Sequence, residues 1–117
     1  MLKLRKSRLF FFIILLLTAC TPKADFDIRG AWDYTMITAN GNTYDVGTIV
    51  FSGQPEKGTY LETNIYEVQY DGEFTVAGSA LTLTGDETWQ GTITETAING
   101  SWSHNDGESG TFSATRK

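Results

Sequence analysis

Residues 88–102 read TWQGTITETAINGSW, and this stretch decides the fold class. It contains two glycines, Gly91 and Gly100, and each is followed two positions later by a large apolar residue, Ile93 and Trp102 respectively. Positions i and i+2 of a strand face the same side of a sheet, so each glycine shares a face with a bulky side chain. The intervening positions are polar. The stretch therefore predicts two short strands with one apolar face, joined by a polar turn.

The rest of the chain after residue 28 repeats this pattern. Seven of the 12 glycines have a large apolar residue two positions later. A glycine on the inner face of a strand leaves space for a neighbouring ring and allows a sharp bend. No window in this region keeps apolar residues at the helical spacing i, i+3, i+4, i+7 over three turns. We predict strands at 29–38, 43–51, 58–70, 73–77, 80–84, 88–94, 97–103 and 109–116.

Short, strongly bent strands in succession favour closure into an up-and-down antiparallel β-barrel, because closure removes the unpaired edges of an open sheet. The predicted fold class is therefore all-β, with a barrel of about eight strands if 58–70 is one strand, or nine if it bends near Asn64. A two-layer β-sandwich is the alternative. The residues expected inside are Trp32, Tyr34, Met36, Ile49, Phe51, Tyr60, Tyr66, Val68, Tyr70, Phe74, Val76, Leu81, Leu83, Trp89, Ile93, Ile98, Trp102, Phe112 and Ala114.

The first 19 residues have the composition of an export signal. Residues 1–8 are basic, residues 9–17 are a continuous apolar run, and the segment ends in small residues. This run is much shorter than the roughly 20 apolar residues that a membrane-spanning helix needs. We therefore expect residues 1–19 to be a cleaved signal peptide.

The end of this segment, Leu17-Thr18-Ala19-Cys20, resembles the lipobox of bacterial lipoproteins. The resemblance implies that the sulfur of Cys20 receives a diacylglyceryl group, that the chain is cut before Cys20, and that its new amino group can be acylated. Two or three acyl chains hold a protein firmly at a membrane, whereas one holds it only marginally. The implied organisation is a lipidated cysteine with a short tether at 20–27, followed by a barrel domain at 28–117.

The same resemblance implies a location in the bacterial cell envelope, with the membrane as a partner through the lipid on Cys20. In a Gram-negative host the residue after the cysteine, Thr21, is similar to the sorting state that permits delivery to the outer membrane. In other hosts the implied location is the outer face of the cytoplasmic membrane.

The predicted mature chain is strongly acidic. Four of the nine basic residues lie in the first eight positions, so removal of residues 1–19 leaves five basic against 14 acidic side chains, a net charge of −9. Such a chain offers no basic stripe for phosphate contacts, which excludes nucleic acid as a partner. Cys20 is the only cysteine, so no disulfide within the chain stabilises the domain.

Both ends of the predicted barrel resemble the lipocalin and calycin group. Gly30-Ala31-Trp32 is similar to the Gly-x-Trp opening of that group, in which a basic residue at the end of the last strand packs over the tryptophan. Arg116 stands at the corresponding place in this chain. The resemblance therefore implies that Trp32 and Arg116 close one end of the barrel, and a cation over an indole ring contributes roughly 0.5–2 kcal/mol. The middle motif of the group and the biotin-binding residues of avidins are not recognisable.

No arrangement of residues in the sequence predicts catalysis. The single histidine, His104, lies in a turn-like stretch, and neighbours within one turn cannot take the orientations of a catalytic triad. The acidic clusters lack the ligand spacing of a calcium loop, and no glycine cluster opens a helix as a phosphate site requires. We expect no enzyme activity, no catalytic residue, no metal site and no cofactor.

The inner aromatic side chains have two interpretations. They fill an eight-stranded barrel, whose interior is just wide enough for side chains, or they line a shallow mouth that holds one small apolar ligand. Along 58–70, Glu62 and Asn64 would share the face of Tyr60 and Tyr66, and a bend at Asn64 would turn them outward. These four residues are the predicted ligand contacts. The expected function is non-catalytic binding of a small hydrophobic ligand, and the alternative is a structural or inhibitory module that contacts an envelope protein.

Overall fold

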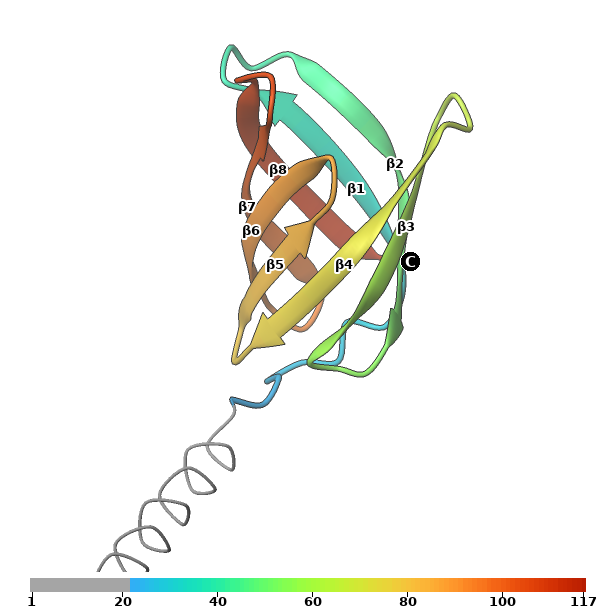
Figure 1. Ribbon diagram of the computed structural model, residues 1–117, viewed down its shortest axis with the longest axis vertical. Coiled ribbons are helices and arrows are strands. Elements are labelled where there is room, and N and C mark those ends of the chain that lie inside the picture. Colours follow the sequence, from blue (N-terminus) through green and yellow to red (C-terminus); the bar gives the residue numbers. More distant parts are fainter. Residues whose placement is uncertain (1–21) are drawn as a thin grey trace, which may run out of the picture.

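The computed structural model describes residues 22–117, which form a closed β-barrel (Figure 1). Its strands are β1 (Gly30–Thr38), β2 (Thr43–Gly53), β3 (Lys57–Asn64), β4 (Gln69–Ala77), β5 (Ala80–Thr84), β6 (Glu87–Ile93), β7 (Ala97–His104) and β8 (Ser109–Arg116). Each strand pairs antiparallel with the next, and β8 closes the barrel on β1. The predicted all-β, up-and-down barrel is confirmed, and the sandwich alternative is wrong.

The predicted signal peptide at 1–19 and the predicted lipidation site, Cys20, lie outside the described residues. Within residues 22–117, no helix has the length and apolar character needed to cross a membrane.

One predicted strand is wrong, because the segment 58–70 contains a turn. β3 ends at Asn64, whose side-chain Oδ1 accepts hydrogen bonds from the backbone N–H groups of Tyr66 and Val68, both at 2.9 Å. Glu67 completes the turn with a φ of 64°, in the left-handed region. A local hydrogen bond of this kind offers the backbone an alternative to the sheet ladder. The chain therefore reverses after Asn64, and this turn extends beyond the barrel wall (Figure 1).

The predicted break at 71–72 is also wrong, because it lies inside β4. Gly72 is paired with Tyr60 of β3, and a Cβ at Gly72 would come within 2.8 Å of the Tyr60 ring. The glycine is there to make room for that ring and forms no turn. The predicted strand 58–70 is therefore divided at the turn, and its last residues are joined to the predicted strand 73–77. The number of strands stays at eight.

The interior of the barrel is packed with apolar side chains. The buried hydrophobic residues are Ile28, Trp32, Tyr34, Met36, Ile49, Phe51, Tyr60, Phe74, Val76, Leu81, Leu83, Trp89, Ile93, Ile98, Trp102, Phe112 and Ala114. Ile28 was not predicted. Three predicted core residues are exposed, Tyr66 by 79%, Val68 by 44% and Tyr70 by 38%, because they belong to the turn after Asn64 or follow it closely.

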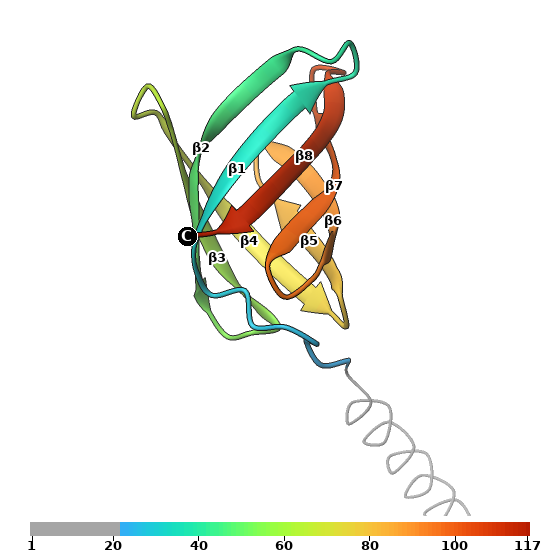
Figure 2. The ribbon, with the colours of Figure 1, turned by 180° about the vertical axis from the view of Figure 1, so that it is seen from behind.

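One end of the barrel, which we call the floor, contains the turns 54–56, 78–79 and 94–96 and the segment 22–29. Arg116 lies over the ring of Trp32 there, with its guanidinium carbon 4.4 Å from the ring centroid. The Trp32 indole N–H donates to the carbonyl of Ile28 at 2.8 Å, and the guanidinium donates to the carbonyls of Asp27 and Arg29. These contacts hold the segment before β1 across the floor (Figure 2).

The segment that we predicted to be a short tether is bonded to the barrel. Ala24 forms a parallel bridge with Gly78, and its N–H donates to a carboxylate oxygen of Glu56 at 3.1 Å. Two further backbone hydrogen bonds, from Asp25 to Gly78 and from Gly78 to Lys23, extend this pairing. Phe26 packs against the core. The described chain therefore enters the barrel along the floor from residue 23 onward.

Candidate functional site

The opposite end of the barrel, which we call the mouth, contains the turns 39–42, 65–68, 85–86 and 105–108. A hollow of about 310 Å³ lies there, within the size range of small-molecule sites. Its lining comes from β2, β3, β4, β6, β7 and two of the turns: Tyr44, Asp45, Asn64, Tyr66, Tyr70, Asp86, Glu87 and His104. The mouth therefore combines aromatic rings with carboxylates from strands that are far apart in the sequence.

A β-bulge places Tyr44 at the mouth. Met36 of β1 pairs with Asp45, whereas the next residue, Ile37, pairs with Thr43, so Tyr44 is an extra residue in the ladder. A bulge of this kind re-aims a side chain. The ring of Tyr44 packs on the ring of Trp102 with the centroids 4.4 Å apart.

Glu62 lies directly beneath the hollow. It occupies the inner face of β3 two residues before Asn64, and it pairs with Tyr70 of β4. Asn64 and Tyr70 both line the hollow. Only 1% of Glu62 is exposed, and its Oε2 has no hydrogen-bond partner. Burial, and then the negative charge of Glu87, raise the pKa of the Glu62 carboxyl to about 8, and the nearby Tyr34 hydroxyl offsets part of this effect. Buried polar groups normally find a partner, so this oxygen requires an explanation.

Asp45 and Tyr34 form a polar pair next to Glu62. The Tyr34 hydroxyl donates to Oδ2 of Asp45 at 3.1 Å, and the backbone N–H of Val46 donates to Oδ1. Burial, together with the charges of Glu62 and Asp45, raises the pKa of the Tyr34 hydroxyl far above its usual range. Tyr34 therefore stays a neutral donor that holds Asp45 in place.

Glu87 and Trp89 form the opposite wall. Burial raises the pKa of the Glu87 carboxyl, while the Trp89 indole N–H and His104 oppose that shift. The Trp89 N–H is nevertheless buried without a hydrogen-bond partner of good geometry. In residues 22–117, Glu62 Oε2 and Trp89 Nε1 are the two buried side-chain polar atoms left unpaired, and both belong to this end of the barrel.

The four predicted ligand contacts do not all share one environment. Asn64 and Tyr66 line the hollow, and Glu62 lies beneath it. Tyr60 is buried deeper, with its ring against Gly72 and Gly85. The bend after Asn64 is present, yet Glu62 remains inside, so the prediction that such a bend would turn Glu62 outward is wrong.

The other residues of the mouth were not predicted. Sequence reasoning assigned His104 to a solvated turn, but it is half-buried at the end of β7, pairs with Glu87 across the ladder, and lines the hollow. Its Nδ1 lies 3.1 Å from Asp106. No local motif marks Asp45 or Glu87, because their proximity depends on barrel closure.

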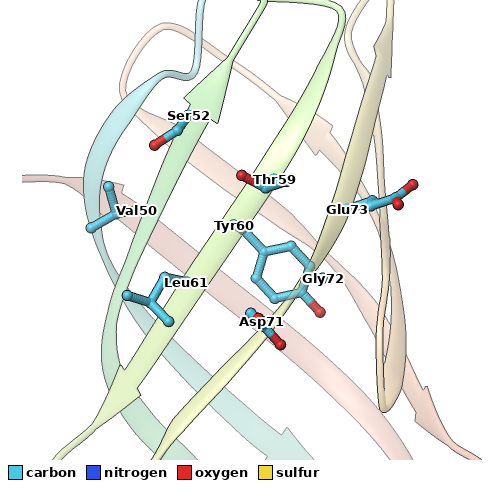
Figure 3. A pocket seen from close by; sticks show the side chains of 8 residues that line it. All are labelled: Val50, Ser52, Thr59, Tyr60, Leu61, Asp71, Gly72 and Glu73. Atoms are coloured by element: carbon cyan, nitrogen blue, oxygen red, sulfur yellow. The ribbon is translucent and has the colours of Figure 1, made fainter.

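A larger hollow, about 590 Å³, lies on the outer wall across β2, β3 and β4 (Figure 3). Val50 and Leu61 line it and are 38% and 41% exposed. Figure 3 shows the Tyr60 side chain passing behind the wall toward Gly72. Apart from buried Tyr60, the side chains that line this hollow are exposed, and neither of the buried unpaired polar atoms lies there. The mouth is therefore the better candidate.

Charge is distributed unevenly between the two ends. Every lysine and arginine of residues 22–117 lies at the floor end: Lys23, Arg29, Lys57, Arg116 and Lys117. The mouth end carries Asp45, Glu62, Glu67, Asp86, Glu87, Asp106 and Glu108. In the described part of the chain, no group of three or more His, Cys, Asp or Glu residues is arranged to hold a metal ion.

Comparison with known proteins shows the fold. No family model matches the chain, and no curated protein is significantly similar to it in sequence. A redesigned β-barrel superposes with a TM-score of 0.62 at 19% identity, covering 77% of this chain and 91% of that chain. The redesigned β-barrel mFAP1, bound to DFHBI, gives 0.58 at 21% identity over 76% of this chain and 94% of that chain. A de novo designed fluorescence-activating β-barrel gives 0.56 at 14% identity over 78% and 94%.

Proposed function

We propose that the barrel binds a small molecule at its mouth without catalysis, and that the protein is displayed on the bacterial cell envelope by a lipid on Cys20. The hollow at the mouth carries the proposal, since it opens at one end above a filled interior and has unpaired buried polar atoms beneath it. A pocket with apolar walls and a few convergent polar groups is typical of ligand sites.

Exposed apolar side chains support the same location. Five of the seven large hydrophobic side chains that are exposed in residues 22–117 lie at the mouth or in its turns: Tyr44, Ile65, Tyr66, Val68 and Tyr70. Exposed apolar patches of this kind mark interaction sites. One structural neighbour, mFAP1, is a barrel of the same fold bound to a small ligand, DFHBI. Because the mouth has an open hollow, it supports ligand binding rather than the alternative of a structural or inhibitory module that contacts an envelope protein.

The proposed anchor and the mouth fit together geometrically. Residue 23 is hydrogen-bonded to the floor, and Cys20 is three residues before it. Three residues span at most about 10 Å, so a lipid on Cys20 would hold the floor next to the bilayer. The mouth would then face away from the membrane and be open to ligand.

Binding at the mouth is tested with a panel of small neutral and charged aromatic molecules, using saturation-transfer NMR on the full-length protein in a non-ionic detergent with detergent alone as the blank. Tyr70→Ala removes a ring that lines the hollow, and we expect it to weaken binding at least about fivefold. Leu61→Ala on the outer wall is the matched control, because Leu61 is similarly exposed, 41% against 38% for Tyr70. Equal losses in the two variants would contradict binding at the mouth.

The anchor is tested by Cys20→Ser and intact-mass measurement of membrane fractions. We expect the wild-type mature chain to begin at Cys20 and to carry the added mass of its lipid. In the variant, this lipidated species should be absent. A variant that remained on the membrane with the same mature mass as the wild-type protein would show that Cys20 is not the anchor.

A further inference from the structure

Three carboxylates converge at the mouth with no lysine or arginine beside them. Asp45, Asp86 and Glu87 line the hollow, and every lysine and arginine of the described residues lies at the floor. His104 also lines the hollow, but it contacts Asp106 through Nδ1. Like charges held together in a partly desolvated site destabilise one another, so such a site favours a counter-charge.

A second observation, independent of these exposed charges, points to a ligand. The carboxyl of Glu62 is buried under the hollow with Oε2 unpaired. A buried acceptor left unsatisfied is destabilising, and a hydrogen-bond donor that enters from the mouth would remove that penalty. The charged groups that act on the Glu62 carboxyl, Glu87, Asp45 and Asp86, are all acidic, so none of them supplies a basic donor.

The walls between these charges are aromatic. The rings of Tyr44, Tyr66 and Tyr70 line the hollow, and Tyr44 is supported by the ring of Trp102 beneath it. Tyrosine faces attract cations as well as apolar groups. The combination differs from a purely hydrophobic pocket, because anionic groups and ring faces both surround the space.

We propose that the mouth takes a small organic cation, in which a protonated amine is held by Glu87 and Asp45 above Glu62, and an aromatic or apolar body packs on the tyrosine rings. This proposal rests on the proposed function and specifies the class of its ligand. An inorganic cation fits less well, since no group of three or more potential ligating residues in 22–117 is placed to hold a metal ion.

The test compares three probes of similar size and different charge: 2-phenylethylamine, 2-phenylethanol and 3-phenylpropanoate. Their affinities for the full-length protein in a non-ionic detergent are measured by calorimetric titration at pH 7. We expect the amine to bind at least about tenfold more tightly than the alcohol, and the carboxylate to bind most weakly. Raising the salt concentration should weaken amine binding severalfold and leave alcohol binding unchanged, because exposed charges are screened by salt.

Substitutions identify the groups responsible. Glu87→Gln and Asp45→Asn keep the shape of the mouth and remove one charge each, so each should reduce amine affinity about tenfold while leaving alcohol affinity unchanged. Glu95→Gln is the matched control, because Glu95 is exposed in a turn at the floor. Circular dichroism verifies that each variant is folded, and the salt dependence of the unmodified protein provides a test that needs no variant.

The outcomes separate this proposal from the proposed function. If the alcohol binds as tightly as the amine and Tyr70→Ala weakens both, the mouth is a binding site but does not select cations, and the inference is overturned. An amine affinity that survives both charge-removing substitutions, or that falls equally in Glu95→Gln, also overturns it. If none of the three probes binds, the inference fails together with the proposed function.

Discussion

Glu62→Gln is expected to stabilise the protein at neutral pH by about 2–3 kcal/mol. The carboxyl is buried, lacks a partner for Oε2, and has its pKa raised to about 8 by burial and by Glu87. At pH 7 the folded protein keeps this carboxyl protonated while the unfolded chain ionises it, which favours unfolding, and Gln has nearly the same shape but cannot ionise. The increase is large compared with the total stability of a small domain, roughly 5–15 kcal/mol.

The gain depends on pH in a defined direction. The pKa of Glu62 is about 8 in the folded protein, against 4.5 for an unperturbed glutamate carboxyl. Below pH 4.5 the carboxyl is protonated in both folded and unfolded states, so it adds no pH dependence. Between pH 4.5 and 8 only the folded state keeps the proton, and the free energy of unfolding falls by up to about 1.4 kcal/mol per pH unit. Above pH 8 both states are ionised and the loss is complete.

Urea unfolding of residues 22–117, followed by tryptophan fluorescence at pH 5, 7 and 9, measures this effect. All eight strands and the floor segment lie within that range. The free energies of unfolding of the wild type and of Glu62→Gln should be close at pH 5 and should diverge as the pH rises. Glu95→Gln, at an exposed position, should follow the wild type throughout. If the free energy of unfolding depended on pH in the same way for Glu62→Gln and the wild type, Glu62 would not be a destabilising buried acid. A variant less stable than the wild type at pH 7 would contradict that assignment too.

Trp32→Ala is expected to lower the free energy of unfolding by about 3–5 kcal/mol. Trp32 is fully buried at the floor, donates its indole N–H to Ile28, and lies under the guanidinium of Arg116. Truncation removes these contacts, leaves a cavity, and releases the segment before β1. The loss approaches the total stability of a domain of this size, so a large part of the population should unfold.

The matched comparison is Arg116→Met, which keeps an apolar stem over the ring and removes the charge. Its cost should be about 1–2 kcal/mol, because it loses an exposed cation–π pair and the hydrogen bonds to the carbonyls of Asp27 and Arg29. Thermal unfolding of both variants gives the ratio of the two effects. If Trp32→Ala costs no more than Arg116→Met, the indole is not the main element that closes the floor.

The barrel could be predicted because its signal is local and repeated. Glycine followed two positions later by a bulky residue recurs along the chain, and Trp32, Phe112 and most other predicted core residues are buried as that alternation requires. A bend near Asn64 was predicted only as an alternative, because the cause of the turn is a single side chain that bonds two backbone N–H groups. Asp71-Gly72 has the composition of a turn, but Gly72 serves to accommodate the ring of Tyr60 from the neighbouring strand.

The site could be predicted only in part, because its residues meet through barrel closure. Glu62 was predicted as a site residue because it shares a face of its strand with Tyr60, which was expected inside. Asp45 and Glu87 carry no local signal, since their proximity depends on the pairing of strands distant in sequence. The bulge that aims Tyr44 at the mouth comes from a register shift between β1 and β2, which periodicity does not reveal. The docking of residues 23–28 on the floor depends on contacts with Gly78 and Glu56, in distant turns.

The indole N–H signals of Trp89 and Trp32 provide the most direct measurement of ligand entry at the mouth. The indole N–H of Trp89 is unpaired beneath the mouth, whereas that of Trp32 is bonded to Ile28 at the floor. On titration of ¹⁵N-labelled residues 22–117 with 2-phenylethylamine and 2-phenylethanol, the Trp89 indole signal should shift in a saturable way while the Trp32 signal stays in place. A Trp32 shift as large as that of Trp89, or no shift of the Trp89 signal with either probe, would contradict a ligand site at the mouth.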